Sequence, residues 1–181
     1  MANKICRPLF EVQDFQYARI KVPTGQTYYP GDVVLAETLD TTITDNLEVY
    51  APTPISDITT QYPVIIINQG FEVTSDGRRI SGNPDISTYS YSAGTVLNAI
   101  RLHKDMKFII SDDCLDNTGV VAVAAGVYLI PQNSDVNLAT SLTTGTAVTA
   151  LKIELDTNEA NGGLNGLNFV DTALARVVLP V

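Results

Sequence analysis

Pro30-Gly31-Asp32-Val33-Val34-Leu35-Ala36 is the stretch that decides the fold, because a similar pattern occurs again as Ala93-Gly94-Thr95-Val96-Leu97-Asn98-Ala99. In each copy, a glycine comes shortly before residues that favour extended structure. Glycine adopts backbone conformations that other residues resist, and Val-rich runs suit a pleated, half-buried surface. Both copies therefore predict a turn that leads directly into a β-strand.

Other parts of the chain also consist of short apolar or alternating runs separated by turn residues. The apolar run 64–67 predicts a strand buried on both faces, and the strict alternation over 151–155 predicts a strand with one polar face. Asp76-Gly77 between extended segments predicts a tight hairpin. Further strands are expected over 95–102, 106–111, 120–124 and 127–130. The spacing predicts an all-β fold, an antiparallel β-sandwich or barrel of short strands with long loops and little helix.

The chain has few candidate helices and one candidate division. One turn of helix is allowed over 133–140, and a short helix is allowed over 171–176, although Val177-Val178-Leu179 favours a closing strand. Residues 1–16 show no clear period, so we expect an N-terminal arm ahead of a β domain over 17–181. If that domain has two lobes, they divide near the proline-interrupted region 51–63.

Composition narrows the classes of partner. The 181 residues include 45% hydrophobic residues, enough for a packed core, and carry a formal net charge of −9. This acidic balance disfavours direct binding to nucleic acid, whose phosphates need a basic face. No apolar stretch approaches the length of a membrane helix, and the first residues do not resemble a signal peptide. We therefore expect no membrane association and synthesis in a cytoplasm.

The residues that usually carry catalysis do not form a recognisable set. His103 is the single histidine, which excludes a metal site with two histidine ligands, and no G-x-S-x-G motif is present to support a Ser-His-Asp triad. We expect His103 to be a surface side chain. The acidic segment 111–119 does not match a calcium loop and is expected to be a solvated turn. Cys6 and Cys114 are expected to be two partly buried thiols, although one disulfide is allowed. We expect no enzyme activity, no cofactor and no metal.

Two surface features could contact other molecules. Arg78 and Arg79 lie beside the predicted hairpin tip, where paired arginines either face an acidic partner or simply solubilise an edge strand. Tyr89-Ser90-Tyr91 lies on a loop before Gly94 and could be exposed, which leaves carbohydrate binding open.

The two glycine-turn motifs resemble those of structural proteins from tailed-bacteriophage virions, in particular head decoration or cement proteins. In those proteins, short β segments are introduced by turns like Tyr29-Pro30-Gly31-Asp32-Val33-Val34 and Ser92-Ala93-Gly94-Thr95-Val96-Leu97. The low charged fraction of 17% and the abundance of Thr and Asn agree with this resemblance.

The resemblance implies a non-enzymatic protein on the capsid exterior that binds the major capsid protein and stabilises contacts between its subunits. It also implies a homo-oligomer, either a trimer or a dimer. The contact residues expected are Lys4, Ile5, Arg7 and Phe10 of the arm, together with Arg78 and Arg79. Alternatives are another phage component, such as a head fibre base or a tail tube subunit, and a carbohydrate-binding surface module.

Overall fold

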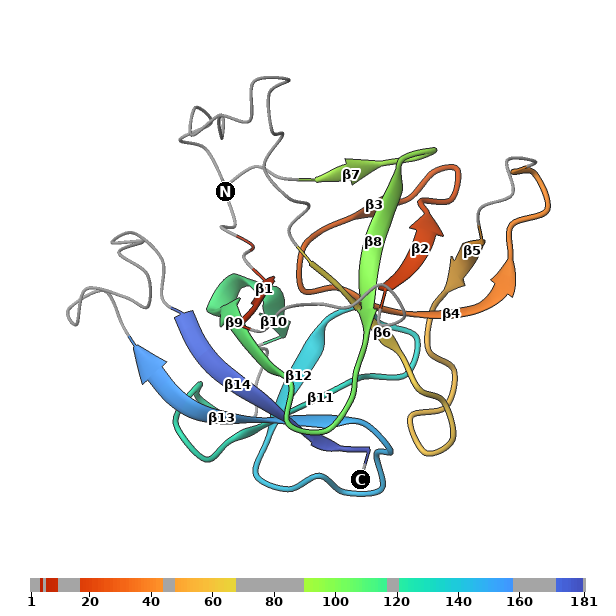
Figure 1. Cartoon of the computed structure of the whole chain (residues 1–181). Helices are drawn as coiled ribbons and strands as arrows, with labels where there is room; N and C mark the ends of the chain where they lie inside the picture. Colours follow the sequence, from red (N-terminus) through yellow and green to blue (C-terminus); the bar gives the residue numbers. More distant parts are fainter. Residues whose placement is uncertain are drawn as a thin grey trace, which may run out of the picture.

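The computed structural model describes residues 4, 6–9, 17–43, 48–67, 90–116, 121–157 and 172–180. These residues form fourteen strands and one 3₁₀ turn, and they contain no α-helix. The strands build a curled seven-stranded sheet, a closed five-stranded barrel and a small two-stranded ribbon (Figure 1). The predicted all-β architecture is therefore confirmed.

The barrel contains both copies of the glycine motif. Gly31 has a φ of 90° and leads into β4, and Gly94 has a φ of 85° and leads into β8. Both angles lie in the left-handed region that glycine adopts without steric cost. The pair β2 and β5 is parallel, and the other described barrel pairs are antiparallel. Around the barrel, the strands are β2 (Tyr17–Lys21), β5 (Val49–Thr53), β4 (Val33–Leu39), β6 (Val64–Ile66) and β8 (Val96–Arg101).

The seven-stranded sheet is built mainly from the second half of the chain. Only β1 comes from the N-terminal end, where it pairs antiparallel with β9. At the opposite edge, β10 pairs parallel with β12. In order across the sheet, the strands are β1 (Cys6–Pro8), β9 (Lys107–Ser111), β14 (Thr172–Leu179), β13 (Ala150–Thr157), β11 (Tyr128–Ile130), β12 (Leu138–Ser141) and β10 (Leu115–Asp116).

The sheet is curled, and β9, the neighbour of edge strand β1, is followed directly in the chain by the other edge strand β10. The 3₁₀ turn η3 (Asp112–Cys114) separates the end of β9 from the start of β10. β9 carries the edge strand β1, whereas β10 is itself the other edge. The short turn η3 therefore brings β10, at one edge, close to β9, which pairs with the other edge strand β1. We call the gap between β1 and β10 the seam.

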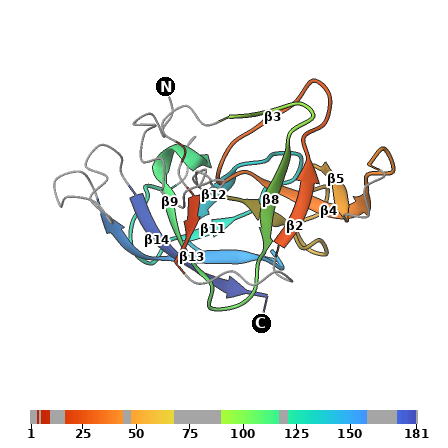
Figure 2. The same ribbon diagram turned by 45° about the horizontal axis from the view of Figure 1, so that its top comes forward.

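Barrel strand β6 and the first half of β4 are buried on both faces, which explains their continuous apolar runs. Along β4 and β6, Val33 and Ile65 join the core shared with the seven-stranded sheet, whereas Val34 and Ile66 join the core inside the barrel. Successive side chains of a strand point to opposite faces, so each strand contributes to both cores. Figure 2 shows β9 and β14 on one side of the molecule and β4 and β5 on the other. The prediction that 64–67 is buried on both faces is confirmed.

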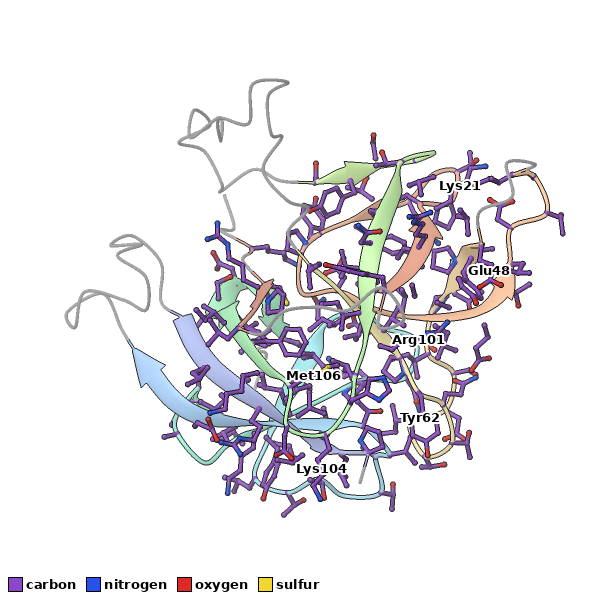
Figure 3. All side chains as sticks on the ribbon, in the orientation of Figure 1. Lys21, Glu48, Tyr62, Arg101, Lys104 and Met106 are labelled. Atoms are coloured by element: carbon purple, nitrogen blue, oxygen red, sulfur yellow. The ribbon has the colours of Figure 1, made fainter. Side chains whose placement is uncertain are left out.

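The β3–β7 ribbon belongs with the barrel. It joins β3 (Thr27–Tyr28) to β7 (Tyr91–Ser92) in antiparallel register. Tyr28 and Tyr91 both pack into the core inside the barrel. Met106, by contrast, joins the shared core between the sheets, while the neighbouring Lys104 is exposed (Figure 3).

Several local predictions were wrong. Residues 121–124 form no strand, and the expected helical turn over 133–140 instead contains the start of β12. The optional helix beginning near 171 is part of β14, as the following apolar run indicated. Strand pairing decides these segments, because β14 lies between β9 and β13 and is paired on both sides. The strand over 151–155 is confirmed as part of β13.

Other predictions concern the division of the chain. Residues 6–8 of the expected arm form β1, so part of the arm is an edge strand of the sheet. The region 51–63 connects β5 to β6, which belong to the same barrel. The division into lobes stays a prediction. The hairpin at Asp76-Gly77 lies outside the described residues.

Candidate functional site

The turn before β4 fits closely against the chain segment at the seam. A Cβ atom on Gly31 would lie 2.6 Å from Cβ and 2.7 Å from Sγ of Cys114. The Cys114 thiol donates a hydrogen bond of 3.2 Å to the carbonyl of Pro30. Because no side chain other than hydrogen fits there, the glycine at this position serves two purposes: it forms the turn and permits the contact.

The turn is also bonded to both neighbouring parts of the fold. The backbone N–H of Gly31 donates to the carbonyl of Ile66 at 2.7 Å, which holds the turn to barrel strand β6. The N–H of Val33 donates to the carbonyl of Val136 at 2.7 Å, and Val136 precedes β12 of the seven-stranded sheet. The turn therefore joins the barrel to the sheet.

Cys6 and Cys114 lie in this junction as thiols. Both are 0% exposed and belong to the core shared by the barrel and the sheet. Burial raises the pKa of Cys6 well above its ordinary value, and the nearby Cys114 raises it further. A backbone hydrogen bond from Gly31 acts in the opposite direction. Cys114 therefore lies against Gly31 and close enough to Cys6 to affect the ionisation of that thiol.

Asp32 brings a buried carboxylate to the same place. Its side chain is 1% exposed, and Oδ2 accepts a hydrogen bond of 2.8 Å from the backbone N–H of Tyr29. Lys4 Nζ lies 3.4 Å from Oδ1 of Asp32. Burial raises the pKa of Asp32 to about 6, against the opposing effect of the Lys4 ammonium. The pair thus fixes the segment before β1 to the turn before β4.

Lys4 also contacts the loop before β12. Its Nζ donates to Oδ1 of Asn137 at 3.1 Å and lies 4.9 Å from the centroid of the Tyr29 ring. Asp135 holds that loop in shape, because its Oδ1 accepts hydrogen bonds from the N–H groups of Val136 and Asn137. We call the residues of this junction the seam cluster; they are Lys4, Cys6, Gly31, Asp32, Cys114 and Asn137.

The chemistry available to the seam cluster is limited by its members. Its two thiols are the nucleophilic groups, and its carboxylate is already paired with an ammonium. Within the described ranges, no group of three or more His, Cys, Asp or Glu side chains could hold a metal ion. The cluster therefore combines a structural junction with one pair of oxidisable side chains.

Of the expected contact residues, the structure describes two. Lys4 is a member of the seam cluster, and its side chain is 16% exposed. Arg7 is half-buried on β1, opposite Ile109 of β9. Ile5, Phe10, Arg78 and Arg79 lie outside the described residues. The neighbouring Leu9 is 48% exposed, and its N–H donates to the carbonyl of Lys107.

Three further sequence predictions concern individual side chains. His103 is exposed, as expected. The segment expected to be a solvated turn instead begins with η3 and contributes the buried residues Cys114 and Leu115, so that prediction was wrong over 111–116. Tyr91 is 6% exposed and donates a hydrogen bond to the carbonyl of Ile67, which removes it from any exposed sugar-binding loop.

An ion-pair network that no sequence pattern predicts lies on the outer face of the seven-stranded sheet. Glu154 of β13 pairs with Lys107 of β9 at 3.0 Å and with Arg176 of β14 at 2.5 Å. Arg176 also lies 3.5 Å from Asp105. These pairs are substantially exposed, so they contribute little to stability. Only the strand order across the sheet brings them together.

Comparison with family models, with curated proteins and with solved structures found no match to this chain. No helix among the described residues is long and apolar enough to cross a membrane.

Proposed function

We propose that this chain is a non-enzymatic structural protein of a tailed-phage virion that binds the outer capsid surface and stabilises contacts between major capsid subunits. The proposal starts from the two glycine-turn strand motifs, which open the barrel strands β4 and β8. The observation that carries it is the position of the N-terminal segment, which forms the edge strand β1 of the larger sheet.

An edge strand suits a role in protein assembly. The outer backbone edge of β1 faces the seam, so a partner chain would recognise the exposed side chains that flank this strand. Arg7 and the exposed Leu9 are at this edge of the sheet and combine one charge with one apolar group. Arginine is enriched at protein interfaces because it forms several hydrogen bonds while its stem packs on apolar surface. We assign these two residues to the capsid contact.

Many copies would make a modest contact effective. A specific interface buries roughly 1,000 Å² or more, which is a large demand on a single small edge. Oligomers bound at repeated positions on a capsid engage several contacts together, so the overall attachment is much stronger than one contact. The proposal therefore includes a homo-oligomer, a trimer or a dimer, on the virion exterior.

The test is sedimentation of purified protein with capsids that were assembled from the same viral genome after deletion of this gene. We expect the chain to sediment with these capsids, and we expect Arg7→Glu to weaken this binding about tenfold or more. Lys104→Glu makes the same charge change at an exposed turn between β8 and β9 and should bind normally. Absence of the chain from both virions and capsid pellets would reject the proposal.

The same preparation distinguishes the other virion roles. Purified protein that forms tubes or stacked rings without capsids would favour a tail tube subunit over decoration. Binding restricted to one vertex of the capsid would favour a head fibre base. The carbohydrate-binding alternative has less support, because Tyr91 is buried.

A further inference from the structure

We propose that Cys6 and Cys114 are an oxidation site, at which an intramolecular disulfide forms in an oxidising medium and closes the seam of the seven-stranded sheet. The inference does not depend on the proposed virion role. It rests on where the topology places the two residues and on what surrounds them.

The two cysteines lie at opposite edges of one sheet. Cys6 begins β1, which is one edge strand, and Cys114 comes immediately before β10, which is the other. Cys6 pairs with Ile110 of β9, and only the end of β9 and the turn η3 separate Ile110 from Cys114. A bond between the two sulfur atoms would therefore connect edges that the backbone hydrogen bonds leave separate.

The side chains converge on one residue. Cys114 occupies the space that a side chain of Gly31 would need, and Gly31 also lies close enough to Cys6 to influence its pKa. Both cysteines are fully buried in the same core cluster, and the nearby Cys114 raises the pKa of Cys6. Formation of the bond requires rotation about χ1, which takes the Cys114 sulfur away from the Pro30 carbonyl to which it donates a hydrogen bond.

The chemistry is a thiol–disulfide exchange with a small disulfide such as oxidised glutathione. The thiolate of one cysteine attacks a glutathione sulfur, the glutathione S–S bond breaks, and one reduced glutathione leaves. The second cysteine then attacks the protein sulfur of this mixed disulfide, forms the Cys6–Cys114 bond and releases the second reduced glutathione. The protein loses two electrons and two protons, and oxidised glutathione gains them.

Burial determines when this exchange occurs. The raised pKa of Cys6 keeps the thiol protonated near neutral pH, and the folded core excludes the oxidant. Exchange therefore begins when the short strand β1 detaches from β9, because detachment exposes Cys6. A three-residue edge strand opens more readily than the interior of a sheet. The thiols stay reduced in a cytoplasm and become oxidised slowly outside it.

The consequence is a covalent connection around the barrel. All five barrel strands lie in the chain between residues 6 and 114, so the disulfide encloses the whole barrel in one loop. Closing a long loop restricts the unfolded chain, and for a loop of this size we expect the melting temperature to rise by roughly 10 °C.

The experiment treats the folded full chain with oxidised glutathione and maps its peptides by mass spectrometry without reduction. We expect a peptide that joins Cys6 to Cys114 in a monomeric chain, with a higher melting temperature that returns to its original value on reduction. Cys6→Ser and Cys114→Ser should show neither the linked peptide nor the thermal shift. The same oxidant applied to the urea-unfolded chain shows that it is active.

Two results would overturn the proposal. One is a folded chain that retains both thiols under conditions that oxidise the unfolded chain completely. The other is a product with only glutathione adducts or intermolecular bonds, since either shows that the two sulfur atoms do not meet. Both readouts use the wild-type chain, so they apply even if a serine variant folds poorly.

Discussion

Gly31 and Gly94 occupy equivalent positions in the two sequence motifs, but their surroundings differ. Both have a positive φ, as the motif predicts. A Cβ on Gly94 would meet nothing within 4 Å, whereas a Cβ on Gly31 would collide with Cys114. The sequence predicts the shared conformation because the signal is local. It could not predict the collision, because Cys114 approaches from a distant part of the chain.

This difference predicts unequal effects of alanine. Gly31→Ala should destabilise the fold by about 3 kcal/mol or more, because it adds a steric clash to an unfavourable backbone conformation. Gly94→Ala is the matched control and should cost only about 1 kcal/mol. Urea unfolding of both variants measures the difference. Equal losses would mean that Cys114 moves away from residue 31 without cost.

Asp32 predicts a dependence of stability on pH. Its pKa in the fold is about 6, above its ordinary value of 3.8, so the folded state binds the proton more tightly. The stabilisation is therefore complete below about pH 4 and is lost as the pH rises through about 6. Between about pH 7.5 and pH 5, the free energy of unfolding should increase by roughly 1.4 kcal/mol from this group.

Urea unfolding at the two pH values tests this assignment. Asp32→Asn should remove the increase, because asparagine does not titrate. Asp40→Asn is the control, since Asp40 is bonded to Thr42 and Lys21 and its pKa is lowered rather than raised. Its contribution is lost only in more acidic solution. An unchanged pH dependence in Asp32→Asn would contradict the prediction.

Among the elements, the strands show which structural features a sequence pattern can predict and which it cannot. A continuous apolar run indicates a strand covered on both faces, and β6 is such a strand. The pattern does not indicate which layers cover it. The short strands β10 and β12 and the segment 121–124 were not predicted correctly, because their state depends on pairing with distant neighbours.

Substitutions of two adjacent residues test whether β6 is buried on both faces. Ile65 packs in the core shared with the seven-stranded sheet, and Ile66 packs in the core inside the barrel. Ile65→Ala and Ile66→Ala should each reduce the free energy of unfolding by about 3 kcal/mol. Val96→Ala on β8 is the control, because Val96 is 48% exposed, and it should cost less than about 0.5 kcal/mol. A loss at only one of the two isoleucines would show that the strand has one solvated face.

In the whole molecule, the N-terminal segment is an integral part of the fold. It completes the seven-stranded sheet as β1, and Lys4 ties it to Asp32 and to the loop before β12. The sequence predicts that this segment is an arm, but it does not predict how the segment is attached to the sheet. The relevant partners Asp32 and Asn137 are remote in sequence and have no motif that links them to Lys4. Because Lys4 is bound within the fold, we assign the contact with a partner chain to Arg7 and Leu9 among the described residues.

We propose that this chain acts by binding the exterior of a protein shell. The most direct measurement is an electron cryomicroscopy reconstruction of capsids that lack the chain, compared with the same capsids after purified chain is added. We expect ordered additional density at junctions between major capsid subunits, with the β1 edge facing the shell. A shell without additional density at saturating concentrations of folded protein would contradict it.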